Sequence, residues 1–400
     1  MLYIKVAELC YTECIMRIAM IGQKAVPFYR DGGVETHVEA LATRLAKRGH
    51  EVTVFVRRRY VATKEDVWEG VHLVRVPEIP TKHLGTISST FFATFYVLHT
   101  QFDIIHFHGV GPALLSWIPR LFTRAKIVVT FHSIDRFHSK WGLFSRLVLR
   151  FGEWMALHVP HKAIATSQSI VQYCKIHYGK EPVYIPNGVE IQKSKGTEQL
   201  ARWGLTRNSY LLTVARLVRH KGIHSLITSY KEIPDSIKGE MKLVIVGAPS
   251  FTRKYDAYLR ELAGEDHRIV FTGYQTGEPL KQLYGNAYLY VHPSEYEGLS
   301  LTILEAMSFG KCVLVSDIPE NLEAIDHSGV PFEVGNIDDL ANKITNLMNH
   351  PEVIEARSKL AIGYMKRHFE WDMIVEKTLA QYAKLFDDAE KICLVDKNVL

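Results

Sequence analysis

Short apolar runs of strand length alternate with longer amphipathic stretches along almost the whole chain of 400 residues. The stretch Val34–Arg48 carries apolar residues at helical spacing and stops before Gly49, as a helix with one buried face does. Strands and helices that alternate with short connections favour a parallel sheet covered by helices on both faces. In the first half, the expected strands are Ile18–Ile21, Val52–Val56, Leu73–Val76, Ile104–Phe107, Ile127–Phe131, Ala163–Ala165 and Val183–Ile185.

The alternation pauses once and then restarts, which predicts two domains. The pause comes at Pro186–Gly188 and at the polar stretch 190–199. We expect two doubly wound, Rossmann-like α/β domains, residues 16–189 and 190–370, facing a central cleft at the carboxyl ends of their strands. In the second half, the expected strands are Tyr210–Val214, Leu243–Val246, Ile269–Phe271, Leu289–Val291 and Val313–Val315.

The two ends of the chain lie outside this pattern. Met16–Gly22 is a complete opening strand closed by glycine, so we expect residues 1–15 to be an N-terminal extension that need not be native. Residues 371–400 are expected to hold a last helix, Trp371–Phe386, which crosses back to the first domain, and a tail.

Composition narrows the function classes. The 48 Lys and Arg against 43 Asp and Glu give a net charge of +5, too dilute to indicate nucleic-acid binding. The 5 cysteines form no C-x-x-C pair, so neither a disulfide framework nor a zinc ribbon is indicated. No apolar run reaches the roughly 18 residues of a membrane helix. Because no signal peptide precedes Met16 either, we expect a cytoplasmic protein.

The strongest chemical signal is a pair of glutamates, Glu297 and Glu305, separated by the sequence GLSLTIL. A Pro-Ser pair and an expected strand precede them, and a helix is predicted over 301–309. The amides of residues 298–301 would then lie at a helix N-terminus, which binds anions. Carboxylates on either side of a bound phosphate can hold the hydroxyls of two sugars. The alternative is two solvated glutamates that flank an ordinary helix start.

A basic pair follows the first expected strand of the second domain. Arg216 and Lys221 come directly after the run that ends at Val214, at the carboxyl end of the sheet. The planar guanidinium and the compact ammonium together can neutralise two phosphates, which predicts a diphosphate site. The alternative is a solvated pair on the surface.

Glycines and histidines follow strands of the first domain. Gly32 and Gly33 allow the backbone to approach a ligand closely, although two adjacent glycines can also mark only a turn. His106, His108 and His132 stand at strand ends, where ligands bind. No third ligand at an obvious spacing joins His106 and His108, so we expect no metal site. His132 is the histidine expected to contact substrate, whereas His108 fits a structural hydrogen bond.

Several motifs of other nucleotide-binding proteins are missing. The chain has neither the G-x-G-x-x-G fingerprint after its first strand nor a G-x-x-x-x-G-K-[ST] loop. It also has no D-x-D pair, with which many nucleotide-sugar enzymes hold a divalent metal on the diphosphate. Arg216, Lys221 and helix dipoles would therefore have to stabilise the phosphate charge without a metal.

Taken together, these motifs resemble the retaining glycosyltransferases of the GT-B fold, specifically family 4, over nearly the whole chain from Met16. The matching parts are the Gly32-Gly33 loop, His132, the V-A-R-L…K-G run and the E-x7-E element. The opening G-Q-K…G-G-V-E is similar to enzymes that build bacterial surface polysaccharides. The resemblance implies metal-independent transfer from a nucleoside-diphosphate sugar to a saccharide or lipid-linked acceptor, with retention at the anomeric carbon and no cofactor.

The resemblance also implies roles for individual residues. Those expected in catalysis are Glu297, His132, Arg216 and Lys221. Those expected to bind the donor are Gly33, Arg216, Lys221, Tyr274, Glu297, Gly298, Leu299, Ser300 and Glu305. Arg216 and Lys221 would hold the diphosphate, Glu305 the ribose, and Glu297 and His132 the sugar, with Tyr274 near the base. Whether Glu297 acts as a nucleophile or positions the sugar stays open.

The acceptor side is less visible in the sequence. The stretch 137–159 is aromatic, apolar and basic, which is typical of a helix that rests on an anionic membrane at the inner face. It also fits a helix packed on its own domain. Two alternatives to a transferase remain within the same fold: a nucleotide-sugar epimerase, and a non-catalytic scaffold that binds nucleotide sugars. A polysaccharide phosphorylase is a third, although no lysine context typical of its cofactor is visible.

Overall fold

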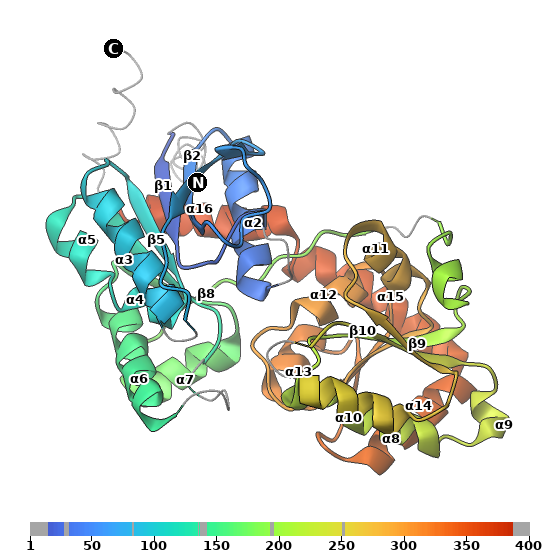
Figure 1. Cartoon of the computed structure of the whole chain (residues 1–400). Helices are drawn as coiled ribbons and strands as arrows, with labels where there is room; N and C mark the ends of the chain where they lie inside the picture. Colours follow the sequence, from blue (N-terminus) through green and yellow to red (C-terminus); the bar gives the residue numbers. More distant parts are fainter. Residues whose placement is uncertain are drawn as a thin grey trace, which may run out of the picture. The chain divides into compact units, whose positions relative to one another are not determined.

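The structure, a computed structural model, describes residues 15–386 except 28–31, 82–83, 135, 137–141, 193–195 and 250–252. The chain divides into two compact units (Figure 1). Unit 1 comprises Met1–Gly188 and Trp371–Leu400, and unit 2 comprises Val189–Glu370. Each unit holds its own largely parallel sheet with helices on both faces, so the expected α/β fold class is confirmed. The expected extension and tail lie almost wholly outside the described residues.

The sheet of unit 1 has eight strands in the order β3-β4-β2-β1-β5-β6-β7-β8. All neighbouring strands pair in parallel except β3, which is antiparallel to β4. The strand order reverses between β1 and β5, which lie side by side. The strands are β1 (Arg17–Ile21), β2 (Glu51–Arg57), β3 (Val67–Trp68), β4 (Val71–Val76), β5 (Ile104–His108), β6 (Lys126–Phe131), β7 (Lys162–Ala165) and β8 (Val183–Tyr184).

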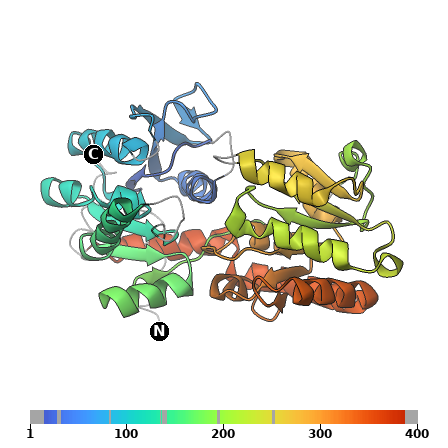
Figure 2. The ribbon, with the colours of Figure 1, turned by 60° about the horizontal axis from the view of Figure 1, so that its bottom comes forward.

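Helices cover both faces of this sheet because successive side chains of a strand point to opposite sides (Figure 2). In β1, Ile18 and Met20 belong to the core with α2 and α16, whereas Ala19 and Ile21 belong to the core with α3, α4, α6 and α7. The helices are α2 (Gly33–Lys47), α3 (Leu84–Leu98), α4 (Val110–Ala113), α5 (Trp117–Phe122), α6 (Leu143–His158), α7 (Gln168–Tyr178) and α16 (Trp371–Ala383).

The last helix, α16, is part of unit 1. Tyr382 on α16 is fully buried, and its hydroxyl lies 2.6 Å from Nδ1 of His106 in β5. The chain leaves unit 1 at Gly188, where a Cβ would stand 2.4 Å from the Trp371 ring. Glycine is therefore required at this position for the close packing of Trp371.

Unit 2 repeats the same architecture with six parallel strands in the order β11-β10-β9-β12-β13-β14. The strands are β9 (Tyr210–Val214), β10 (Lys242–Val246), β11 (Ile269–Gly273), β12 (Leu289–His292), β13 (Val313–Ser316) and β14 (Val330–Phe332). The helices are η2 (Leu200–Trp203), η3 (Arg219–Lys221), α8 (Ile223–Glu232), α9 (Asp235–Lys238), α10 (Arg253–Ala263), α11 (Gly277–Asn286), α12 (Leu301–Ser308), α13 (Pro319–Ile325), α14 (Ile337–Asn349) and α15 (Pro351–His368).

The structure also contains two strands that the apolar pattern did not predict, β3 and β14. Both are edge strands of two or three residues. Such strands are half-exposed and too short to carry a readable apolar run. The helix predicted over 301–309 is α12, which ends one residue earlier, at Ser308.

Candidate functional site

The predicted diphosphate residues of unit 2 lie where its strand order reverses. β9 and β12 are neighbours at the centre of the sheet, and each is followed by a loop that carries site residues. In doubly wound sheets, ligands bind at this position, at the carboxyl ends of the strands. Lys221, in the loop after β9, forms an ion pair with Glu297, in the loop after β12. The structure thus brings together two residues that are 76 positions apart in the sequence.

The two loops are held against each other by backbone contacts. Gly222 adopts a left-handed conformation with φ of 65°, and a Cβ there would stand 1.9 Å from the carbonyl oxygen of Pro293. The Glu295 N–H donates a hydrogen bond to the His220 carbonyl (2.8 Å). The Lys-Gly pair of the sequence therefore has a structural reason: glycine lets the loop come close enough for Lys221 to reach Glu297.

Glu297 is surrounded by further hydrogen-bonding groups. The Nε2 atom of His292 lies 2.8 Å from Oε1 of Glu297, and the Tyr290 hydroxyl lies 3.3 Å from Nδ1 of the same ring. Burial by itself raises the pKa of Glu297, but the charge of Lys221 and the His292 hydrogen bond outweigh burial and hold it well below its usual value. Because burial also lowers the pKa of His292, a neutral ring donates from Nε2 to an ionised carboxylate.

The second glutamate lies on α12. Oε2 of Glu305 accepts a hydrogen bond from the buried Tyr284 hydroxyl (2.9 Å), which holds the carboxylate in one place. Leu299 and Ser300 are buried at the start of α12, Gly298 is half-buried before them, and Ser300 is the N-cap residue. The first N–H groups of a helix have no partner within the helix, and those of α12 lie between the two glutamates in sequence, as an anion site between them requires.

Two predicted donor residues of unit 2 follow strand ends. Arg216 follows β9 and is exposed, and its guanidinium has no hydrogen-bond or ion-pair partner among the described residues. Tyr274 follows β11 and is 38% exposed. An exposed, unpaired guanidinium at the end of a central strand is available to an anionic ligand.

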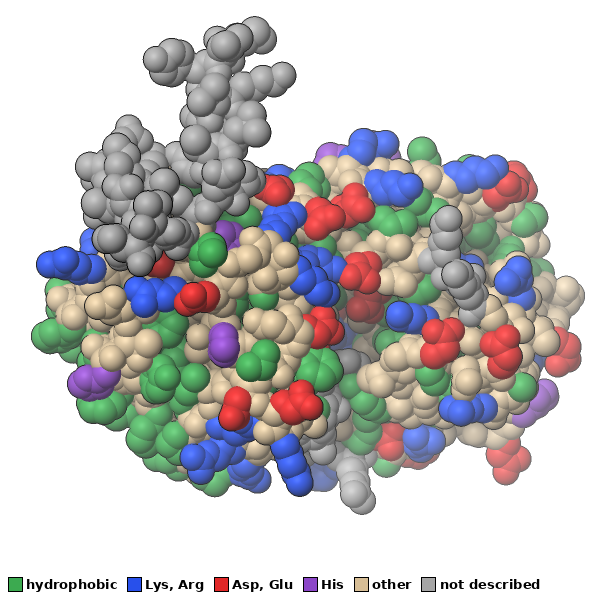
Figure 3. Space-filling model, turned by 90° about the horizontal axis from the view of Figure 1, so that it is seen from above, with side chains coloured by type: hydrophobic (Ala, Val, Ile, Leu, Met, Phe, Trp, Pro, Cys, Tyr) green, Lys and Arg blue, Asp and Glu red, His purple; other side chains and the backbone are tan. Residues whose placement is uncertain are grey.

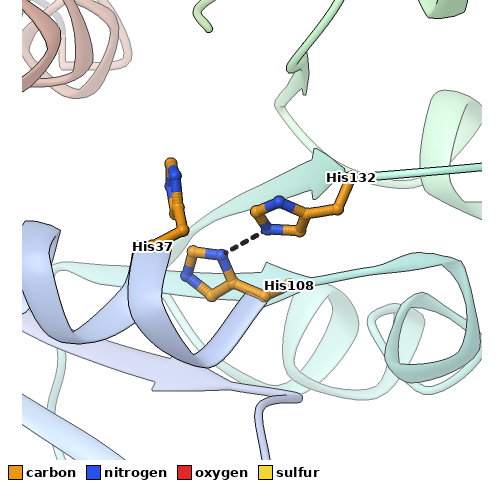
Figure 4. Close-up of side chains that lie close together, drawn as sticks. All are labelled: His37, His108 and His132. Atoms are coloured by element: carbon orange, nitrogen blue, oxygen red, sulfur yellow. Dashed lines mark hydrogen bonds between the residues drawn. The ribbon is translucent and has the colours of Figure 1, made fainter. Parts of the chain in front are cut away.

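In unit 1, the remaining predicted residues follow β1 and β6, the two neighbours of β5 in the sheet. Gly33 is the first residue of α2, after β1, and His132 directly follows β6. Nε2 of His132 lies 3.2 Å from Nδ1 of His108, the last residue of β5. His37, one turn into α2, completes a group of three imidazoles with His108 and His132 (Figure 4).

Burial keeps these histidines uncharged. It lowers the pKa of His37 to about 4, against the opposing effect of a hydrogen bond with Asn187. Burial also holds the pKa values of His108 and His132 well below their usual range, and the neighbouring imidazoles add to this effect. His106 differs, because its two ring nitrogens lie 2.6 and 2.7 Å from the hydroxyls of Tyr382 and Thr130, which gives it a structural role.

Sequence reasoning missed three residues that the structure places in these networks, namely His37, Tyr284 and His292. His292 is the last residue of β12, so the strand-end argument used for His132 would also have identified it. His37 and Tyr284 lie inside helices, where no local signal distinguishes a site residue from a packed one.

Two family models match consecutive parts of the chain. The model for "Glycosyltransferase Family 4" matches residues 31–193, and the model for "Glycosyl transferases group 1" matches residues 197–363. The chain is similar to an uncharacterized glycosyltransferase of Methanocaldococcus jannaschii, with 27% identity over 387 residues that cover 92% of this chain and 98% of the relative.

Two further similarities extend over the whole chain. A phosphatidyl-myo-inositol mannosyltransferase of Mycobacterium leprae is 24% identical over 94% of this chain and 99% of its own length. Among solved structures, HepE of Anabaena in complex with UDP-glucose matches with a TM-score of 0.75 and 20% identity. That match covers 93% of this chain and 100% of HepE, and it shows a shared fold.

Proposed function

The chain belongs to family 4 of the GT-B glycosyltransferases, and we propose that it transfers a sugar from a nucleotide-sugar donor to an acceptor hydroxyl with retention at the anomeric carbon. The observation that carries the proposal is the Lys221–Glu297 pair, which joins the two loops at the strand-order reversal of unit 2. Arg216, at the end of β9, is the second cation of this site.

The donor diphosphate lies between Arg216, Lys221 and the N-terminal amides of α12 in this proposal. As the bond between sugar and phosphate breaks, negative charge develops on the leaving diphosphate. Cations and amide dipoles that are already in position stabilise this charge without reorganisation. They perform the task for which other nucleotide-sugar enzymes use a metal ion, so we propose metal-independent transfer. Glu305, held by Tyr284, accepts hydrogen bonds from the ribose hydroxyls.

Glu297 positions the sugar rather than attacking it. Lys221 and His292 both engage Oε1 of its carboxylate, which draws electron density from the group and weakens it as a nucleophile. It accepts hydrogen bonds from sugar hydroxyls while Gly298 to Ser300 offer backbone amides. The acceptor hydroxyl attacks the anomeric carbon from the face that the diphosphate leaves. Its proton passes to a departing phosphate oxygen, which balances the transfer.

We further propose that the acceptor is a saccharide or lipid-linked molecule at the inner membrane face, because unit 1 exposes an unusually apolar surface. α3 packs against α4 and α5, and α4 packs against α6, so these helices form one continuous layer. Hydrophobic side chains gather on the left part of the view in Figure 3. The exposed residues that define this apolar face are Phe91, Phe92 and Phe95 on α3, Leu121 and Phe122 on α5, and Leu143, Phe144, Leu147 and Phe151 on α6.

The charges around the apolar face are complementary to anionic lipids. The exposed Arg and Lys side chains of α3, α5 and α6 are Arg120, Arg146 and Arg150. Glu153, the sole acidic residue of these helices, is fully buried and hydrogen-bonded by Tyr173 and Tyr178. Helices whose exposed side chains are apolar or basic, as on α3, α5 and α6, are typical of a protein that lies on an anionic membrane. Among the described residues, no helix is long and apolar enough to span the bilayer.

The proposal is tested by incubating the full chain with a panel of nucleotide sugars in the presence of EDTA. We expect one donor to release its nucleoside diphosphate slowly by hydrolysis. Glu305→Gln should abolish the release, whereas Glu355→Gln, on the exposed face of α15, should leave it unchanged. Conversion of the donor to an epimer would identify an epimerase instead, and binding without turnover would favour a scaffold. A requirement for added metal would contradict metal-independent transfer.

A further inference from the structure

Three imidazoles meet at the carboxyl end of the unit 1 sheet, and they come from three different elements (Figure 4). His37 lies on α2, His108 ends β5, and His132 follows β6. One ring nitrogen of each lies within 4.8 Å of those of the other two. The Nδ1 atom of His108 and the Nε2 atom of His132 are 3.2 Å apart.

The three rings are chemically available as ligands. A histidine binds a metal ion through the unprotonated ring nitrogen of its neutral form. Nδ1 of His37 is buried without a hydrogen-bond partner among the described residues. Buried polar atoms are normally satisfied, so this nitrogen, beside the pair formed by His108 and His132, points to a missing partner. Nearby His106 is excluded, since Tyr382 and Thr130 engage both of its nitrogens.

We propose that His37, His108 and His132 together bind one transition-metal ion of intermediate softness, such as Zn²⁺ or Co²⁺. Zinc–nitrogen bonds of about 2.0–2.1 Å place tetrahedral ligands roughly 3.4 Å apart. The separation of 3.2 Å between His108 and His132 is close to this value. The proposal requires the His37 ring, whose ligand nitrogen lies within 4.8 Å of those of the other two, to move toward this pair when the ion binds. Three imidazoles without a carboxylate bind Zn²⁺ or Co²⁺ and do not suit Mg²⁺ or Ca²⁺.

Such an ion has a way in and an open coordination position. His132 is only half-buried, whereas His37 and His108 are buried, so the cluster is reached past His132. Three protein ligands leave a fourth position for water. The consequence for activity rests on the proposed function and on the contact of His132 with the donor sugar that the resemblance implies. A metal on that ring removes its lone pair from the sugar, so the ion inhibits transfer rather than supporting it.

The metal site is tested on the full chain, stripped with EDTA and titrated with Co²⁺ alone. We expect one equivalent to bind with the intense visible absorption of four-coordinate Co²⁺, and Zn²⁺ but not Mg²⁺ to displace it. His37→Gln should weaken Co²⁺ binding by more than about 100-fold, since it removes a ligand outright. The matched control is His327→Gln, a histidine that is 96% exposed in its side chain, and it should not alter binding.

Two further measurements distinguish a folding defect from the loss of the metal site, and the metal site from its effect on activity. If His37→Gln does not fold by circular dichroism, His108→Gln takes its place, and protection of the half-buried His132 from diethylpyrocarbonate by Zn²⁺ is measured on the unsubstituted chain. Absence of four-coordinate absorption, or equal Co²⁺ affinity in the histidine variants and the control, would overturn the site. Zn²⁺ should also inhibit donor hydrolysis reversibly. Stoichiometric binding without inhibition would support the metal site and contradict the contact between His132 and the donor sugar.

Discussion

The ammonium of Lys221 and the carboxylate of Glu297 pair across the two loops that follow the central strands of unit 2. Their side chains are only 12% and 10% exposed, so each charge is largely withdrawn from water beside its opposite. Burying a lone charge costs far more than burying a pair. The stability of this part of unit 2 and the charge offered to the proposed donor diphosphate therefore depend on the same contact.

Removing the Lys221 ammonium alone should lower both the stability of the folded chain and the rate of donor turnover. Lys221→Met leaves Glu297 buried without its counterion, and we expect the free energy of unfolding to fall by about 3 kcal/mol. Donor turnover should fall by about 100-fold or more, because a cation facing the leaving diphosphate is lost. Chemical denaturation and steady-state kinetics measure the two effects.

The matched control is the double variant Lys221→Met with Glu297→Gln. It removes both charges, so most of the lost stability should return while turnover stays low. If the double variant were no more stable than Lys221→Met, the ion pair would not be the source of the destabilisation.

Acid should weaken the folded state through Glu297. Because its pKa is lower in the folded chain than in the unfolded chain, the unfolded chain takes up the proton first as the pH falls. The stabilisation that the ionised Glu297 gives the folded chain is thus complete above about pH 4.5, the pKa of this glutamate in the unfolded chain. It is lost progressively as the pH falls below that value. Glu297→Gln should flatten the fall of unfolding free energy between about pH 5 and 3, measured by denaturation at each pH. An unchanged acid profile would contradict this assignment.

The close approach of Gly222 to Pro293 allows a second test of whether turnover depends on the contact between Lys221 and Glu297. Gly222→Ala places a Cβ against the Pro293 carbonyl, so the loop must move and separate Lys221 from Glu297. We expect a fall in turnover of at least about tenfold, by analogy with other small misplacements of catalytic groups. Gly179→Ala is the matched control, because Gly179 has a similar φ of 62° but open space around it. That variant should lose only about 1 kcal/mol of stability from backbone strain and keep its turnover.

The fold was predictable because its signal is local and repeated. Each central strand, such as Tyr210–Val214, is buried on both faces and appears in the sequence as an uninterrupted apolar run. The edge strands β3 and β14 lack such runs, and their pairing depends on neighbours that a local pattern does not contain.

The site was only partly predictable, for a different physical reason. Strand ends indicated Lys221 and Glu297 separately, but their contact depends on strand order, which brings β9 beside β12. His37 was missed because it reaches its partners from a helix, at a position that also suits an ordinary packed residue. Its significance appears only when β5 and β6 place His108 and His132 opposite α2.

The anchoring of α16 gives a prediction about stability alone. Tyr382→Phe leaves Nδ1 of His106 buried without its hydroxyl partner, and the free energy of unfolding should fall by about 1–2 kcal/mol. Tyr258→Phe, on the exposed side of α10, should have no measurable effect. Thermal denaturation of the two variants makes the comparison, and equal melting temperatures would show that the bond between α16 and β5 contributes nothing.

The apolar face of unit 1 predicts binding to anionic vesicles. Replacing Phe144 and Leu147 by Glu puts carboxylates on the most exposed turn of α6, so they lose apolar burial and repel the anionic surface. We expect co-sedimentation with phosphatidylglycerol vesicles to fall by at least tenfold at unchanged melting temperature, since both side chains are already exposed. Ile176→Glu is the control, because Ile176 is 75% exposed on α7, outside the apolar face. Equal vesicle binding by all three proteins would exclude this face as the membrane contact.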